Sequence, residues 1–509
     1  MASPAKTVKE EPAASAETES RHAKGLSRRA LVTLGALGAA GKAEAQVRTP
    51  RSSRPTMMPT AELKLLRRVT QGVTTEEVGW MNSLGYYGYL EWQLGAEAIG
   101  DPESESRLQA LPSITYSPFT LYTMDSTVVI RELTDSTIVR AIYSNRQLLE
   151  RMVEFWTDHF HTNITSVGIL KTLEVRDVYR KNALGTFASM LNASASSPAM
   201  LVYLNNTQSD GRPGRTPNQN YARELMELHT LGVDGGYTQQ DVVEVARCFT
   251  GWRAFGNTGD PRAGTFFWDP NRHDNGSKLV LGVPFAAGGG FNDGLNVLNI
   301  LATHPSCARF ISKKLLRWLL NYEPSPALVA DIAGEFTRTG GDIKALVRRI
   351  LSYDNVLWSP PLFKRPFQYI VSALRVMNAN ITSLNTVRQT YLSGTGHTPF
   401  AWGPPDGYPQ DFEYWGGLPL PRWNFAFQLA NSSVSGAVVD LTTLLNGATT
   451  PVQIADRIDT LIFANEMSTA DKTALIAYLR PAGTAATPST NQIRDAFGLA
   501  LASPSFQWH

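Results

Sequence analysis

Cysteine is scarce in this sequence, and its scarcity excludes several classes of protein. Among 509 residues there are two cysteines, Cys248 and Cys307. Two cysteines so placed make no disulfide framework, no zinc-finger spacing and no CxxCH haem site. Cys248 lies in an apolar helical run, where a buried free thiol is common, and one disulfide between the two cysteines is the alternative.

The sequence also lacks a large excess of positive or negative residues. The chain has 47 Lys and Arg against 45 Asp and Glu, a formal net charge of +2. The small basic excess falls within the first 45 residues, so the rest of the chain is close to neutral. A neutral body without a basic stripe argues against nucleic acid as the main partner.

Long hydrophobic runs are absent, and the one notable run has the proportions of an export signal. Ser27-Arg28-Arg29 precede an apolar run from Ala30 to Ala40, and Ala43-Glu44-Ala45 offers a small-x-small cleavage site. The run is too short to span a bilayer, and the adjacent arginines resemble a twin-arginine signal. An incidental arginine pair in a general secretory signal is the alternative.

Three expectations follow from this N-terminus. We expect a twin-arginine-type signal peptide over residues 1–45 and a polar, proline-containing linker over 46–59. The mature protein should be periplasmic or secreted. No later stretch reaches about 18 apolar residues, so no membrane span is expected after cleavage.

From Ala61 onward the apolar residues mostly follow a helical period. Thr265–Trp268 and Lys278–Leu281 are short β-rich runs joined by turn-forming residues, which predict one small β hairpin. The expected fold is mostly α: a single large helical domain over 60–509 with this hairpin as an insertion, or with a C-terminal subdomain as the alternative. Residues 397–422 are too aromatic for a flexible linker and indicate an ordered loop that covers another part of the protein.

The stretch NYARELMELHTLGVDGGYT, residues 220–238, gathers several ionisable side chains. We expect a helix from about residue 218 to 231, with Gly232 as its C-terminal cap. Asn220 opens the stretch and is a candidate supporting residue. A Thr-Gln-Gln-Asp segment at 238–241 then predicts a capping box for a second helix.

Glu224 and Glu227 are the first catalytic candidates, because residues three apart share one face of a helix. Arg223 is four residues from Glu227 and can pair with it. His229 falls well off that face, so the spacing matches neither the Glu-x-x-His pair of di-iron proteins nor His-Glu-x-x-His. The alternative is a buried salt-bridge network that merely holds the helix.

A second group lies in EFWTDHFHTN, where Asp158 is a further catalytic candidate. His159 and His161 can bind one metal ion only if the helix ends there, as the following Thr-Asn indicates. Together with His229 they form a candidate ligand set for zinc, iron or manganese. The alternative is that each is a core histidine among aromatic residues. A third pair, His273-Asp274, lies in a turn and contributes only if the fold brings it to the others.

The sequence also resembles a known family, the bacterial "domain of unknown function 1800" family. The resemblance rests on segments in the same order over about residues 60–509: MVEFWTDHFHT, PNQNYARELMELHTLGVDGGYTQQDVVEVARCFTGW, HPSCARFISKKL, FKRPFQYIVSALR, GPPDGYP and LASPSFQ. It implies an exported, mostly helical protein and implies no reaction.

The resemblance also implies a partner. Members of this family are often encoded beside a second exported family, "domain of unknown function 1501", which resembles alkaline-phosphatase-like enzymes. One departure stands out: Gln219 occupies a position where glutamate is common in the family. Glutamine cannot act as a general base, so Gln219 is left out of the candidate site.

Three functions are compatible with these observations. The first is a metal-dependent hydrolase of an envelope or extracellular polymer, which uses the histidines and carboxylates. The second is a metal-free glycosidase or lyase that works with carboxylates, with the aromatic loop stacking on sugar rings. The third is a non-enzymatic envelope scaffold or partner of the phosphatase-like protein.

Overall fold

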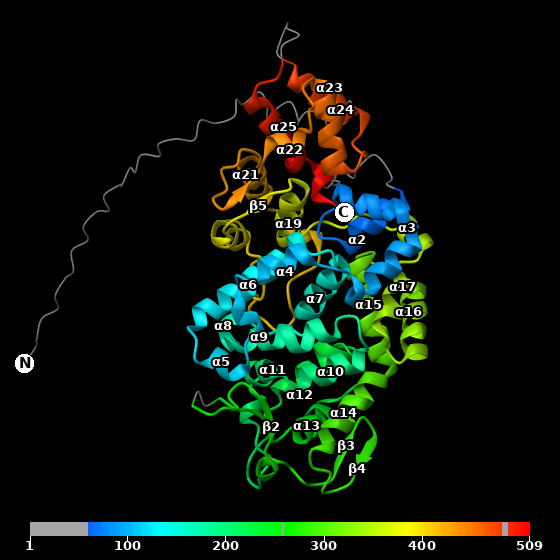
Figure 1. Cartoon of the computed structure of the whole chain (residues 1–509). Helices are drawn as coiled ribbons and strands as arrows, with labels where there is room; N and C mark the ends of the chain where they lie inside the picture. Colours follow the sequence, from blue (N-terminus) through cyan, green and yellow to red (C-terminus); the bar gives the residue numbers. More distant parts are fainter. Residues whose placement is uncertain (1–59, 257–258, 481–486) are drawn as a thin grey trace, which may run out of the picture. The chain divides into compact units, whose positions relative to one another are not determined.

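Helices make up most of the chain, as the periodicity predicts (Figure 1). The computed structural model describes residues 60–256, 259–480 and 487–509. The signal peptide and the linker expected before residue 60 lie outside these ranges and stay predictions. Within them, no helix has the length and apolar character needed to cross a bilayer.

The larger of the two main hydrophobic clusters, here the first core, joins helices from the first two thirds of the chain. Its helices are α2 (Ala61–Val69), α3 (Thr75–Leu94), α7 (Gln147–His159), η4 (Val175–Arg180), α10 (Phe187–Ala195), α11 (Pro198–Tyr203), α12 (Asn220–Glu224), η6 (Leu225–Thr230), α13 (Gln239–Cys248), α14 (Asn292–Thr303), α15 (Pro305–Leu319), α16 (Pro326–Thr339), α17 (Ile343–Ile350) and α18 (Tyr353–Leu357).

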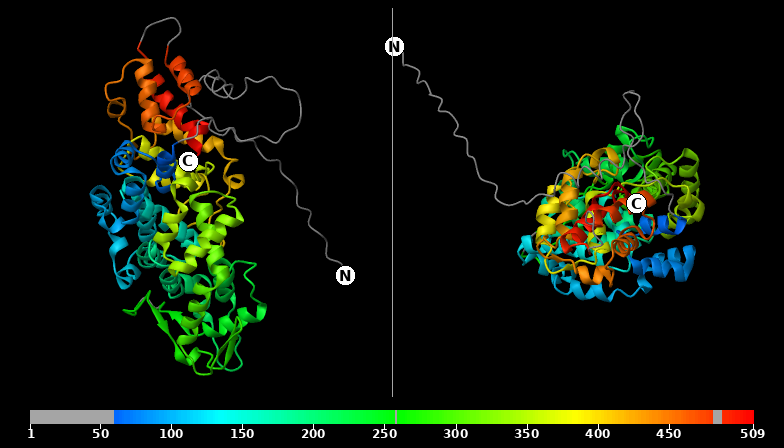
Figure 2. Two further views of the ribbon diagram at one scale, coloured as in Figure 1. Left: turned by 90° about the vertical axis from the view of Figure 1, so that its right-hand side faces the viewer. Right: turned by 90° about the horizontal axis from the view of Figure 1, so that it is seen from above.

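A separate cluster, the second core, is built mainly from the C-terminal third. Its helices are α6 (Ser126–Tyr143), α19 (Pro366–Val376), η8 (Val387–Leu392), α21 (Pro419–Ala430), α22 (Leu441–Leu445), α23 (Pro451–Ile458), η9 (Asp459–Phe463), α24 (Thr469–Leu479) and α25 (Thr490–Ala502). Figure 1 and the left view of Figure 2 show the orange and red helices α22–α25 gathered near α19, away from the green segment that carries the strands. The expectation of one domain over 60–509, with a C-terminal subdomain as the alternative, stays a prediction.

Shorter helices complete the first half of the chain. A small cluster centres on α5 (Pro118–Tyr122), α8 (Ile164–Val167) and α9 (Leu170–Glu174), and α4 (Pro102–Leu108) packs against α6. Long helix α6 contributes side chains to all three clusters, with Val129, Leu133 and Ile138 as examples. Helix α6 therefore connects the three clusters.

Local capping interactions fix several helix starts, and the one at residues 238–241 is as the sequence predicts. Thr74 and Glu77 form a capping box at α3, and Thr238 and Asp241 form one at α13. Asp342 accepts a hydrogen bond from a backbone N–H in the first turn of α17. Each cap satisfies N–H groups that lack partners inside the helix, which is why these boundaries can be read from short motifs.

The prediction that these two β-rich runs pair as one hairpin is wrong. The two runs form strands β2 (Phe266–Trp268) and β3 (Lys278–Val280), but these strands do not pair with each other. Strand β2 pairs with β1 (Trp252–Ala254), and β3 pairs with β4 (Val283–Phe285). A third two-stranded sheet joins β5 (Asn380–Ile381) to β6 (Ala437–Val438).

The reason for the altered pairing lies in the segment between β2 and β3. The backbone N–H of Asp269 donates to the carbonyl of Gly251, and that of Asp274 donates to the Thr250 hydroxyl. Both acceptors follow α13, so the segment is held against the end of this helix. Each strand therefore pairs with its other neighbour in the sequence: β2 pairs with the preceding strand β1, and β3 pairs with the following strand β4.

Two arginines at the ends of α19 connect the cores. Arg365, the residue before the helix, bonds to Glu154 and Asp158 of α7. Arg375, near the other end, pairs with Glu77 of α3 at 2.6 Å and donates to the carbonyl of Gly72 at 2.9 Å. All these contacts cross from the second core to the first.

Cys248 and Cys307 are buried free thiols, so the disulfide alternative is wrong. Burial raises the pKa of the Cys248 thiol to about 12 and raises that of Cys307 further. Both side chains therefore stay protonated and pack as small apolar groups.

We predict that Arg375→Met destabilises the protein by about 3 to 5 kcal/mol, because it leaves the Glu77 carboxylate buried without its partner. Urea unfolding followed by circular dichroism measures the change. Arg348→Met is the matched control, since Arg348 pairs with Glu91 on the exposed surface and should cost less than about 1 kcal/mol. Equal effects of the two substitutions would contradict the proposed role of Arg375.

Candidate functional site

The last turns of α7 carry two carboxylates that share one arginine. The Arg365 guanidinium donates to Asp158 at 2.7 Å and also to Glu154. Glu154 further accepts hydrogen bonds from Gln71 at 2.8 Å and from Arg151 at 3.2 Å. Burial opposes ionisation of Glu154, yet the two arginines and Gln71 hold its pKa below the ordinary value.

Asp158 differs from Glu154, although both contact Arg365. Burial raises the pKa of Asp158 above its ordinary value, and Arg365 offsets only part of this effect. A cavity of about 50 Å³ borders both carboxylates, with Thr157 and Tyr408 also in its wall. This is room for water and not for a substrate, so any substrate must approach Asp158 from elsewhere.

The aromatic loop covers the end of α7, as the sequence predicts. The backbone N–H of Ile164 donates to the carbonyl of Phe400 at 2.9 Å, and the Asn163 amide donates to the carbonyl of Trp402 at 2.7 Å. Gly407 has φ of +77°, and a Cβ atom there would lie 2.1 Å from the Asp158 carbonyl oxygen. Glycine is therefore required at this close approach.

Lys314 of α15 is a cation in an unusual environment near this loop. Burial lowers the pKa of its amine to about 8, although the charges of Asp158 and Asp406 oppose the shift. Over the part of the chain that the structure describes, no carboxylate lies within ion-pair distance of its Nζ atom. Lys314 is thus a partly buried amine that is free to bind something else.

The expected helix at 218–231 begins at Asn220 and is not α-helical to its end. It changes from α12 to a π-helical turn, η6, and the N–H of Leu231 donates to the carbonyl of Met226, five residues earlier. Gly232 follows with φ of +83°, as expected of the cap. Single π-helical turns inside helices are often found at functional sites.

Glu224 and Glu227 are partly buried and, in the described part of the chain, form no ion pair. Burial and the neighbouring Glu227 raise the pKa of Glu224, and Asp406 adds to the effect. The expected pair between Arg223 and Glu227 is wrong: the Arg223 guanidinium donates to Gln239 at 3.0 Å. These carboxylates are therefore not the members of a buried salt-bridge network.

We call Asp158, Glu224, Glu227, Lys314 and Asp406 the Lys314 site. They come from the end of α7, the junction of α12 and η6, helix α15 and the aromatic loop. Each of Asp158 and Asp406 influences Lys314 electrostatically, and Asp406 also influences Glu224. The arrangement joins an amine of lowered pKa, Lys314, to two carboxyl groups of raised pKa, Asp158 and Glu224.

Two other residues near the π-helical turn have supporting roles. Asn220 is exposed, and its side-chain amide donates to the carbonyl of Leu204 at 3.4 Å. Gln219, the departure from the family pattern, accepts a hydrogen bond from Gln239 at 2.8 Å. Gln239 in turn binds Arg223, so these polar groups connect α12 to α13.

The three candidate metal ligands are buried, and two of them lie together. Helix α7 ends at His159, as a shared site with His161 would require. The His159 and His229 rings are 6.2 Å apart between centroids, and Nε2 of His159 donates to the backbone carbonyl of His229 at 3.1 Å. His161 instead donates from Nε2 to the carbonyl of Trp402 at 2.8 Å.

Two ring nitrogens of these histidines bear on whether the site binds a metal ion. Nδ1 of His159 and Nε2 of His229 are buried and have no hydrogen-bond partner among the described residues. In the same part of the chain, no group of three or more His, Cys, Asp and Glu side chains is placed to hold one metal ion. A protein metal site of the expected type needs about three ligands, so the metal assignment stays a prediction.

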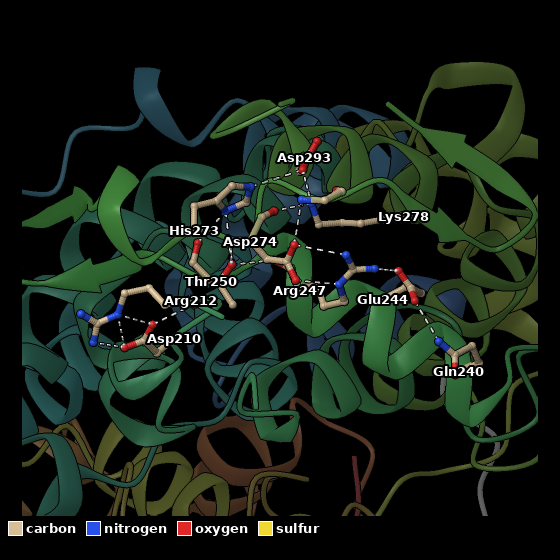
Figure 3. A network of polar contacts seen from close by, with 11 residues as sticks. Asp210, Arg212, Gln240, Glu244, Arg247, Thr250, His273, Asp274, Lys278 and Asp293 are labelled. Carbon is tan, nitrogen blue, oxygen red and sulfur yellow. Dashed lines mark hydrogen bonds and ion pairs between the residues drawn. The ribbon is translucent and has the colours of Figure 1, made fainter. Parts of the chain in front are cut away.

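His273 and Asp274 belong to a separate buried network (Figure 3). Nδ1 of His273 donates to the carbonyl of Thr250 at 2.9 Å, and its Nε2 lies 3.3 Å from an Asp293 carboxylate oxygen. Lys278 donates to that same oxygen at 2.7 Å. Asp274 accepts two hydrogen bonds from Arg247, at 2.7 and 3.1 Å.

The charged groups of this network are paired with one another. Figure 3 shows His273, Lys278 and Asp293 converging above Arg247, which bridges Asp274 and Glu244. Burial opposes ionisation of Asp274, but hydrogen bonds from Arg247 keep its pKa below the ordinary value. Within the described chain no hydrogen bond or ion pair joins this network to the Lys314 site. The contacts of the network position β2 and β3.

Lys314, Arg365 and Asp406 are not among the candidates that the sequence indicates. Lys314 lies in ISKKLLRW and Arg365 in FKRPF, both inside segments that carry the family resemblance. A charged residue within an apolar helical segment is the signal that could have drawn attention to them. It could not have shown that both approach Asp158, which is more than a hundred residues away in the sequence.

Comparison with known proteins identifies the family. The family described as "Protein of unknown function (DUF1800)" matches residues 64–508, so the chain belongs to this family. The resemblance noted in the sequence is thereby confirmed. No curated protein and no solved structure matches the chain.

The buried histidines predict that the protein loses stability in mild acid. Burial lowers the pKa of His161 and His229 to about 3, and lowers those of His159, His397 and His509 well below the ordinary value. In the unfolded chain these rings bind protons below about pH 6.5, while the native rings stay neutral. The free energy of unfolding should therefore fall between pH 7 and pH 5, by about 1 to 2 kcal/mol per ring.

Urea unfolding at pH 7, 6 and 5 measures this dependence. His159→Gln is the test variant, because its amide can still donate to the His229 carbonyl but cannot titrate. Its stability should depend less on pH than that of the unmodified protein. A stability that is constant over this range would contradict the prediction.

Proposed function

We propose that this protein is an exported enzyme that cleaves a carbohydrate polymer by metal-free acid–base catalysis at the Lys314 site. The observation that carries the proposal is Lys314 itself, an amine without an ion-pair partner in the described chain and with a pKa of about 8. Perturbed groups of this kind gather at functional sites more often than elsewhere. Two carboxyl groups of raised pKa, Asp158 and Glu224, support it.

Each group has a proposed role. An amine with a pKa of about 8 is partly deprotonated near neutral pH and can accept a proton from the substrate or from water. Glu224, with its raised pKa, is the proton donor to the leaving oxygen. Asp158 is fixed by Arg365, and its charge acts on Lys314 from a distance by opposing the loss of the proton from the amine.

The aromatic loop supports a carbohydrate as the substrate. Tyr414 is 52% exposed, and its ring lies 5.8 Å from that of Trp402. Trp402 also donates from Nε1 to Asp406 of the site at 2.8 Å. Exposed aromatic faces beside catalytic groups suit the apolar faces of sugar rings, and the loop therefore provides a surface on which a polymer can lie.

We predict that Lys314→Met lowers kcat/KM by a factor of about 10² to 10⁴, the usual contribution of a positioned acid or base. The assay incubates the protein with sacculi, β-glucan, xylan, chitin and alginate and measures new reducing ends and unsaturated products. In the Glu224→Gln variant, where no proton donor is lost as the pH rises, the residual rate should rise through about pH 8 as Lys314 loses its proton. Lys313→Met, the exposed neighbour on α15, is the matched control.

Two results would contradict this function. One is the absence of any cleavage product across the polymers. The other is equal activity of the Lys314→Met and Lys313→Met variants at the same melting temperature. Glu224→Gln separates the proposed roles, because it should reduce the rate without removing the dependence on pH near 8.

A metal-dependent hydrolase is the second candidate. It is favoured by Nδ1 of His159 and Nε2 of His229, which are buried and have no hydrogen-bond partner among the residues that the structure describes. The same cleavage assay discriminates the two functions: activity that survives chelation supports acid–base catalysis. A stoichiometric transition metal, lost together with activity in His229→Ala, would favour the hydrolase instead.

Export is proposed on the basis of the N-terminal sequence. We expect the mature protein in the periplasm or the medium, beginning near residue 46, and Arg28→Lys with Arg29→Lys should retain the precursor in the cell. Fractionation and N-terminal sequencing measure this outcome. Arg21→Lys is the control, and unchanged export of the double variant would point to the general secretory route.

The partner is proposed from the family resemblance: an exported protein of the "domain of unknown function 1501" family. Co-expression of the two mature proteins followed by gel filtration should give a joint peak. Separate elution of both proteins at micromolar concentration would contradict a stable complex, and the scaffold function would lose its main support.

A further inference from the structure

A second cavity, larger than the one beside Asp158, opens between the two cores. Its volume is about 410 Å³, which lies in the range of small-molecule sites. The first turn of α3 and the end of α6 form one side, and the ends of α19, α22 and α23 form the other. None of the residues of the Lys314 site lines it.

Most charged side chains that line this cavity already form ion pairs within the protein. Glu77 and Arg375 pair there at 2.6 Å, with side chains that are 1% and 6% exposed. Glu103 at the rim pairs with Arg107 at 3.1 Å. These groups are engaged, so they contribute shape and polarity and leave no net charge to attract an ion.

Several polar groups at the rim remain available. The Glu76 carboxylate is exposed, and within the described ranges it forms no ion pair. Arg457 uses Nε to donate to the carbonyl of Leu444 at 2.7 Å, and its two terminal nitrogens have no protein partner in that part of the chain. The Asn378 side chain is likewise exposed and makes no hydrogen bond among the described residues.

Asn378 is held in place by the backbone. Its φ is +44°, and its N–H donates to the carbonyl of Arg375 at 2.9 Å, which ends α19. Asparagine tolerates this left-handed conformation better than most residues. The amide is thereby placed at the rim of the cavity, whose lining also includes Trp80 and Tyr143.

We infer that this cavity binds a neutral oligosaccharide, as a site separate from the Lys314 site. One free carboxylate and one free guanidinium balance each other, which disfavours an anionic or a cationic ligand. Amide, carboxylate and guanidinium groups together offer both donors and acceptors, which a sugar with many hydroxyl groups can use. Trp80 adds an aromatic surface, and the volume accommodates more than a single amino acid.

Isothermal titration calorimetry on the mature protein tests this inference. The probes are cellotetraose, maltotetraose and the tetramer of N-acetylglucosamine, with trigalacturonate and glutamate as charged comparisons. At least one neutral tetramer should bind with a Kd of about 1 mM or lower. Binding of glutamate or trigalacturonate alone would overturn the assignment, as would no binding at all.

Variants locate the binding in the cavity. Asn378→Gly removes the amide, tolerates the positive φ, and should weaken binding about five- to tenfold. Asn446→Gly is the matched control, since Asn446 also has a positive φ, of +46°, and does not line the cavity. Glu76→Ala, at an exposed position, provides a second test that does not threaten folding.

The result can be separated from that of the proposed function. Unchanged affinity in both Asn378→Gly and Glu76→Ala would overturn the inference, even if the protein cleaves a polymer. Weakened binding in these variants would support it, even if no cleavage is found. Lost binding in Asn446→Gly as well would show a general effect on the fold and would count against the site.

Discussion

The burial of Arg365 and Arg375 at the two ends of α19 is the constraint on which most of the structure depends. Both arginines flank or belong to α19, a helix of the second core, and their guanidinium groups bind carboxylates of the first core, Asp158 and Glu154 at one end and Glu77 at the other. A buried charge without a partner is costly, so the two cores can separate only if both arginines lose theirs. The two cavities discussed above lie beside these pairs.

The distribution of paired and unpaired charges then separates scaffold from candidate site. Glu154, Glu77 and the network around His273 have partners that account for their charges. Lys314 and Glu224 lack such partners within the described residues, although burial disfavours their charged forms. A partly buried charged group without a partner raises the free energy of the native state unless a ligand binds to it. This contrast, more than the count of ionisable residues, distinguishes the Lys314 site.

Local features of this fold could be predicted from the sequence, and long-range ones could not. The capping boxes at Thr74 and Thr238 depend on residues three apart, so short motifs reveal them. The pairing of β2 and β3 with other strands depends on Thr250 and Gly251 holding the intervening segment, which no local pattern shows. Likewise, Glu224 and Asp158 were identifiable as candidates, but Lys314 joins them only through the packing of α15.

The π-helical turn shows how one local irregularity changes the chemistry of a helix. With regular α-helical spacing, His229 lies off the face of Glu224, and neither residue has an evident connection to the other. The extra residue in η6 accompanies burial of His229 against His159 and near Lys314, whose charge further disfavours protonation of the ring. A protonated Lys314 and a protonated His229 would repel each other in a poorly solvated site. The neutral histidines thus leave the amine as the group there that gains and loses a proton near neutral pH, which is the property that the proposed catalysis requires.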